Sequence, residues 1–89
     1  MFSLLVSVQV SDGGVPPTVG QNYSLTCNVT TDVSSYQWKK DGDILQGEVK
    51  ETLRLPSLSL SSAGQYTCEV IVKLVTYRAD HSISLHSKL

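Results

Sequence analysis

The residues best suited to metal chemistry are Cys68, His81 and His86, whose order and spacing are similar to the second half of a zinc-binding motif. The first half of such a motif needs another cysteine a few residues away. The chain's one other cysteine, Cys27, lies far off in the sequence. We therefore expect no metal site and no cofactor, and we interpret the histidines as ordinary strand residues.

Two further groups have the side-chain types of a catalytic or a calcium site. Asp80, His81 and Ser82 could form a triad by type, but neighbouring strand residues point to opposite faces, and a triad places its base between acid and nucleophile. The turn-like segment 41–43 offers two carboxylates, too few for the oxygen shell of Ca²⁺. We expect no catalytic residue and no enzyme activity in this domain.

Length and composition predict one small globular domain over residues 1–89. The 89 residues are 40% hydrophobic and 17% charged, with a net charge of −1. This charge does not indicate the basic surface that binds nucleic acid. No apolar run approaches the roughly 20 residues of a membrane span. The segment after Met1 is too short, and lacks the basic flank, for a signal peptide. We expect a module excised from a longer protein.

Alternating apolar residues, with little helical periodicity, predict an all-β chain. The alternation is clearest where Tyr23, Leu25, Cys27 and Val29 share one parity. Further strands are expected at 4–10, around 36–40 and 44–45 with a turn at Asp-Gly between them, from 53 to about 56, through the apolar run 69–75, and at 77–85.

The segment from Leu53 to Cys68 organises the rest of the chain. Pro56 has no N–H to give to a sheet, so a strand should end there, and the small residues at 61–64 suit a tight corner. Tyr66 and Cys68 then share one face of the next strand. A tyrosine two residues before a cysteine, just after a corner, resembles the tyrosine corner of immunoglobulin domains, in which the phenol bonds to upstream backbone.

Five features in sequence order, Cys27, Trp38, Leu53, Tyr66 and Cys68, resemble the core of the immunoglobulin superfamily in its C2 or intermediate sets. The resemblance implies an immunoglobulin-like two-sheet antiparallel Greek-key β-sandwich. It also implies a disulfide between Cys27 and Cys68 that joins the sheets, with Trp38, Leu53 and Tyr66 packed around it.

The chain departs from the family pattern at two points. Ser62 stands where the family usually has Asp, so a hydroxyl must accept the turn hydrogen bond. The short gap between the cysteines indicates that one middle edge strand is lost, which argues against a variable-type domain.

A structural disulfide implies a secreted or cell-surface setting. Two N-glycosylation sequons agree with it, Asn22-Tyr23-Ser24 and Asn28-Val29-Thr30. Both asparagines fall on the polar parity of their strand, where a glycan would stand in water. We expect Asn22 and Asn28 to be the glycosylation sites.

The segment 71–78 is the candidate partner-binding region. If strand parity continues past Cys68, Ile71, Lys73 and Val75 point outward, and Tyr77 and Arg78 are of types that anchor interfaces.

The resemblance implies an extracellular recognition or adhesion module of an animal cell-surface receptor, such as a receptor tyrosine kinase, or of an adhesion molecule. Its partner would be a protein, bound homophilically or heterophilically, with no role for nucleic acid and no membrane insertion by this segment. The alternative is a structural spacer repeat without a ligand of its own.

Overall fold

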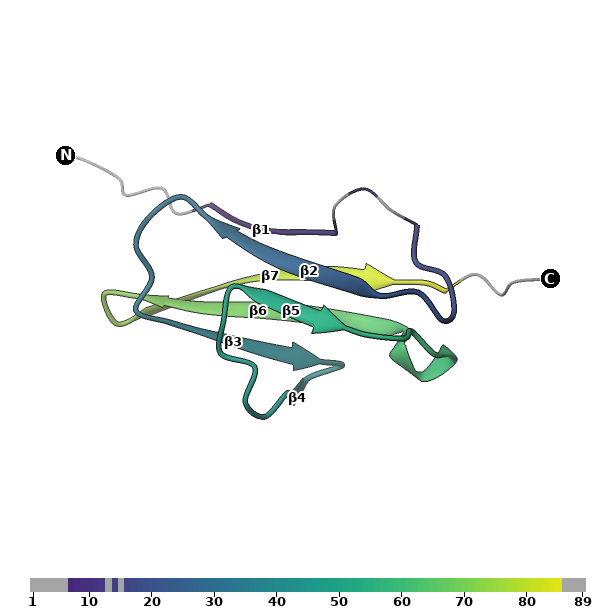
Figure 1. The fold of residues 1–89 in the computed structure, drawn as a ribbon. Coiled ribbons are helices and arrows are strands. Elements are labelled where there is room, and N and C mark those ends of the chain that lie inside the picture. Colours follow the sequence, from purple (N-terminus) through teal and green to yellow (C-terminus); the bar gives the residue numbers. More distant parts are fainter. Residues whose placement is uncertain (1–6, 13, 15, 86–89) are drawn as a thin grey trace.

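The computed structural model, which describes residues 7–12, 14 and 16–85, shows a sandwich of two antiparallel sheets (Figure 1). One sheet has the order β1-β2-β5 and the other β4-β3-β6-β7. The strands are β1 (Val8–Ser11), β2 (Tyr23–Val29), β3 (Ser35–Lys40), β4 (Asp43–Ile44), β5 (Thr52–Leu55), β6 (Gly64–Val72) and β7 (Val75–Ile83). The helical element of the described part is one 3₁₀ turn at Leu60–Ser62. The expected all-β sandwich is confirmed.

The core lies between the sheets and is built by strand alternation. In β2 the buried residues Tyr23, Leu25 and Cys27 alternate with exposed or half-buried ones, as the sequence predicts. The facing sheet contributes alternate residues of β3 and β6. The buried cluster comprises Tyr23, Leu25, Cys27, Trp38, Leu53, Leu58, Tyr66, Cys68, Val70, Val72 and Ile83.

The predicted hairpin at Asp41-Gly42 is present between β3 and β4. Both turn residues have positive φ, 51° and 88°, as a primed two-residue turn requires. The Asp41 carboxylate accepts a hydrogen bond from the Gln65 backbone N–H at 2.9 Å, which ties the turn to β6. Residues 45–51, all described, contain no strand, so the expected loss of a middle edge strand is observed.

The corner before β6 forms as predicted. Strand β5 ends at Leu55, directly before Pro56. The Tyr66 hydroxyl donates to the Ser62 carbonyl at 2.6 Å, and burial raises the pKa of this phenol, with the nearby Asp41 charge adding to the effect. The Ser62 hydroxyl accepts from the Ser59 N–H at 3.0 Å, so it takes the place of the usual carboxylate.

The prediction that strand parity runs unbroken from Cys68 to Val75 is wrong. Strand β6 ends at Val72, and the chain reverses through Lys73 and Leu74 into β7. Val75 therefore pairs with the buried Val72 and lies on the inner side of the sheet. The expected start of the last strand near Tyr77 moves forward to Val75 for the same reason.

The first strand is observed at Val8–Ser11, which overlaps the predicted segment 4–10. Val8 and Val10 pack against the core on one parity, as expected. Leu4 and Val6, and His86 of the discounted metal motif, lie outside the described residues. No helix of the described part is long and apolar enough to cross a membrane.

Candidate functional site

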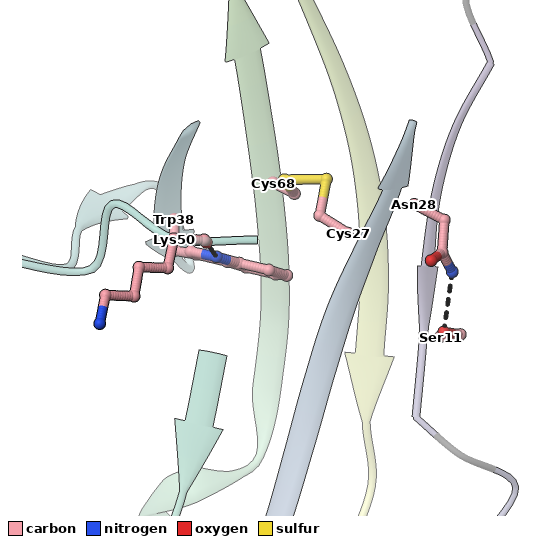
Figure 2. Close-up of a disulfide and its surroundings, with 6 residues drawn as sticks. All are labelled: Ser11, Cys27, Asn28, Trp38, Lys50 and Cys68. Carbon is pink, nitrogen blue, oxygen red and sulfur yellow. Dashed lines mark hydrogen bonds between the residues drawn. A yellow bond between two sulfur atoms is a disulfide. The ribbon is translucent and has the colours of Figure 1, made fainter. Parts of the chain in front are cut away.

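A disulfide between Cys27 of β2 and Cys68 of β6 joins the two sheets at a Cα–Cα distance of 6.3 Å (Figure 2). Trp38 is the register partner of Cys68, so its indole lies beside the bridge on the inner face of β3. The indole is fully buried, and its Nε1–H donates to the Lys50 carbonyl at 2.8 Å. The sulfur of Cys68 is bonded to Cys27 and is not free to ligate a metal.

The outer face of the four-stranded sheet holds a shallow groove that contains apolar side chains. Its volume is about 280 Å³. Its lining residues, which we call the groove residues, are Ser35, Tyr36, Gln37, Val49, Glu69, Ile71 and Thr76. Val49, from the loop between β4 and β5, and Ile71 of β6 are both exposed. The groove therefore combines accessible apolar surface with polar walls.

An ion-pair row crosses the same face beside the groove. Glu69 Oε2 lies 3.2 Å from Lys39 Nζ and 3.5 Å from Arg78 Nη2, and Thr67 donates to Asp80 at 2.6 Å. The face thus presents charges of both signs. Pairs of this kind on a surface contribute little to stability, so the row matters more for the pattern of charge than for the fold.

The β6–β7 turn forms a protruding tip next to the groove. Its two residues, Lys73 and Leu74, have φ values of 48° and 71°. The primed two-residue turn demands such angles but is normally built from Asn and Gly. Leu74 is 98% exposed, although a leucine gains nothing from contact with water. The tip therefore combines backbone strain with an unburied apolar side chain.

The sandwich, the sheet orders and the buried disulfide agree with the comparison against known families. The family model described as "Immunoglobulin domain" matches residues 7–71. The chain belongs to the immunoglobulin domain family.

Solved structures of cell-surface proteins resemble this immunoglobulin domain. The full ectodomain of mouse nectin-like molecule 4, with domains Ig1 to Ig3, is 26% identical at a TM-score of 0.79; the match covers 92% of this chain and 30% of that one. A Dscam structure from work on the structural basis for isoform specificity is 25% identical at a TM-score of 0.76. The match covers 92% of this chain and 21% of that one. The domain spans between a fifth and a third of these proteins.

The immunoglobulin fold places the predicted partner residues in two groups. Ile71 and Arg78 lie on the outer face, and Lys73 lies at the tip. Val75 pairs with Val72 and Tyr77 pairs with Val70, so both belong to the inner side, and Tyr77 packs against the core. The expectation that Val75 lies on the same side of the sheet as Ile71 is wrong, because the turn at residues 73 and 74 resets the parity; Val75 is nevertheless 49% exposed, and Tyr77 is half-buried.

Sequence reasoning missed two groove and tip residues, Val49 and Leu74. Val49 is in a polar loop distant in sequence, and only the fold brings it to Ile71. Leu74 was hidden in an apolar run that carried no turn residue. An isolated apolar residue in the otherwise polar segment 46–51 was the available signal for Val49.

The residues considered for other chemistry are separated by the fold. Asp80 accepts a hydrogen bond on the outer face, while His81 lies on the inner side with Nε2 3.6 Å from Asp12 Oδ2. Among the described residues, no three His, Cys, Asp or Glu side chains are grouped to hold a metal ion.

Proposed function

We propose that this immunoglobulin domain is an extracellular recognition module of a cell-surface adhesion protein, and that it binds a second copy of itself. The contact is made by the groove residues together with the tip, Lys73 and Leu74, which we call the hairpin face. The observation that carries the proposal is the exposed Leu74 on a strained turn beside an apolar groove. Exposed apolar surface with a polar rim is the mark of a protein-binding site.

The likeness to the Dscam and nectin-like ectodomains supports an adhesion protein, rather than a receptor tyrosine kinase, as the parent. A buried disulfide and the two sequons support the extracellular setting. Against a pure spacer repeat, the exposed side chains of Val49, Ile71 and Leu74 lie on one side of the four-stranded sheet, so they form a patch and not a single scattered residue.

A second copy suits the hairpin face because the face has both halves of a contact. The tip projects and the groove is hollow, so a two-fold arrangement can set each tip against the other copy's groove. Charges are mixed as well, since Lys39 and Arg78 both pair with Glu69 on this side of the sheet. When two copies of such a face meet, positive groups of one can lie against negative groups of the other.

The experiment is clustering of beads coated with the chain, because many copies on one bead amplify a weak contact. The test variant is Ile71→Lys/Leu74→Lys. The matched control is Leu60→Lys, at a site that is 71% exposed on the 3₁₀ turn, outside the hairpin face. Disulfide content and thermal unfolding establish that each variant is folded.

We expect the wild type and Leu60→Lys to cluster, and the double variant to lose at least tenfold in clustering rate. Beads of the wild type that stay dispersed would contradict self-recognition. Clustering by the folded double variant would contradict the hairpin face as its site.

A further inference from the structure

The outer face of the three-stranded sheet is polar at every described strand position. Its residues are Gln9, Ser11, Ser24, Thr26, Asn28, Thr52 and Arg54. The exposed large hydrophobic residues of the described chain lie elsewhere: Ile44, Val49, Leu60, Ile71, Leu74 and Val75. The two outer faces of the sandwich therefore differ in kind.

Both sequon asparagines are exposed and belong to this polar side. The residues on either side of Asn28 in β2 point inward. Figure 2 shows Asn28 on the side of that strand away from the disulfide. Asn22 comes directly before the buried Tyr23, so the same alternation directs it outward. Neither amide is enclosed by other elements, so both have room for a bulky substituent.

The hydrogen bonds of the two amides are compatible with a sugar on Nδ2. Asn28 Nδ2 donates to Ser11 Oγ at 3.0 Å, and a substituted amide nitrogen keeps one hydrogen for that bond. Asn22 uses its Oδ1, which accepts from the Ser57 N–H at 3.1 Å. That bond leaves Nδ2 free. Modification at either site therefore removes no contact that the fold uses.

We infer that the outer face of β1-β2-β5 is an N-glycosylated face, with Asn28 and Asn22 as attachment sites. In the reaction, Nδ2 forms a bond to the anomeric carbon of an oligosaccharide donor activated as a lipid diphosphate. The bond from that carbon to the diphosphate oxygen breaks, the lipid diphosphate leaves, and Nδ2 loses one proton. The inference rests on the secretory setting of the proposed function.

Glycans at these sites would define which surface is open to proteins. They cover the polar sheet with hydrated carbohydrate and leave the hairpin face on the other sheet uncovered. Each sheet therefore has one role. Glycans shield the three-stranded sheet from other proteins, and the four-stranded sheet binds a second copy of the domain.

The test is intact mass of the 89-residue chain secreted from eukaryotic cells, before and after treatment with a peptide N-glycosidase that converts glycosylated Asn to Asp. The variants are Asn22→Gln, Asn28→Gln and both together. Ser24→Thr and Thr30→Ser keep their sequons and serve as controls. We expect each Gln variant to lose one glycan mass and the double variant to carry none.

Sugar at either asparagine of the wild type supports the inference, since either site lies on the polar face. A secreted, disulfide-bonded chain without sugar at both sites would overturn it. Bead clustering of that same preparation reports separately on self-recognition, so the failure of one proposal is distinguishable from the failure of the other.

Discussion

Asp12 connects the bend after β1 with strands of both sheets. Its Oδ2 accepts from the Tyr23 hydroxyl at 2.7 Å and lies 3.6 Å from His81 Nε2, and its Oδ1 accepts from the Gly14 N–H at 2.8 Å. The Tyr23 hydrogen bond is the main cause that lowers the pKa of Asp12. Burial, and then the bond to Asp12, raises the pKa of Tyr23.

The lowered pKa predicts how stability responds to acid. Asp12 contributes stability above its unfolded pKa of 3.8, and this contribution is lost as the pH falls through its lower folded pKa. We expect wild type to be more stable than Tyr23→Phe at pH 6, and the difference to shrink below pH 3.8. Thermal unfolding of both proteins from pH 6 to pH 2 measures it. A difference that stays constant over this range would contradict the role of Asp12.

The sequence predicted single residues well where their roles follow from local spacing. Cys27, Trp38 and Tyr66 were found because each sits on an alternating strand at a position that the fold type requires. The role of Asp12 is not predicted from the sequence. Its contacts come from residues 11 and 69 positions later, which no local pattern encodes.

At the scale of elements, the two hairpin turns of the four-stranded sheet differ in whether the sequence predicts them. The β3–β4 turn uses Asp41-Gly42 and was predicted, since Gly tolerates positive φ. The β6–β7 turn imposes the same kind of angles on Lys73-Leu74 and was missed. The nine-residue pairing of β6 with β7 overrides the local preference.

This strain predicts the effect of exchanging the turn for a favoured one. Lys73→Asn/Leu74→Gly relieves positive φ at both positions, so we expect about 1 kcal/mol of added stability and a rise of roughly 4–8 °C in the unfolding midpoint. The same change removes the exposed leucine, so we expect bead clustering to fall.

Thermal unfolding and clustering of one preparation measure both effects of the exchange. An unchanged midpoint would contradict the strain, and unchanged clustering would contradict a role for the tip in recognition.

At the scale of the whole molecule, the sequence predicted the architecture but not the division between its faces. The alternation of apolar residues predicts the strands, and the resemblance to immunoglobulin domains implies the two sheets and the disulfide between Cys27 and Cys68. A bridge of this kind stabilises a domain by about 4 kcal/mol in the chain-entropy model. Which outer face is apolar depends on register and on the loop carrying Val49, both of which are set by long-range pairing.

Together the two proposals assign recognition of a second copy to one sheet and carbohydrate to the other. A sequon placed on the recognising face tests this assignment directly. Gln37→Asn/Lys39→Thr creates one at a groove residue, because Trp38 separates the two positions. Lys39→Thr alone is the control, since it also removes the ion pair to Glu69 but adds no sugar.

The measurement is bead clustering by three folded, secreted proteins whose glycans have been determined by mass. We predict that the wild type clusters with its native glycans in place, that Lys39→Thr clusters nearly as fast, and that a glycan at position 37 abolishes clustering. Undiminished clustering with sugar at position 37, or clustering that appears only after the native glycans are removed, would contradict the account.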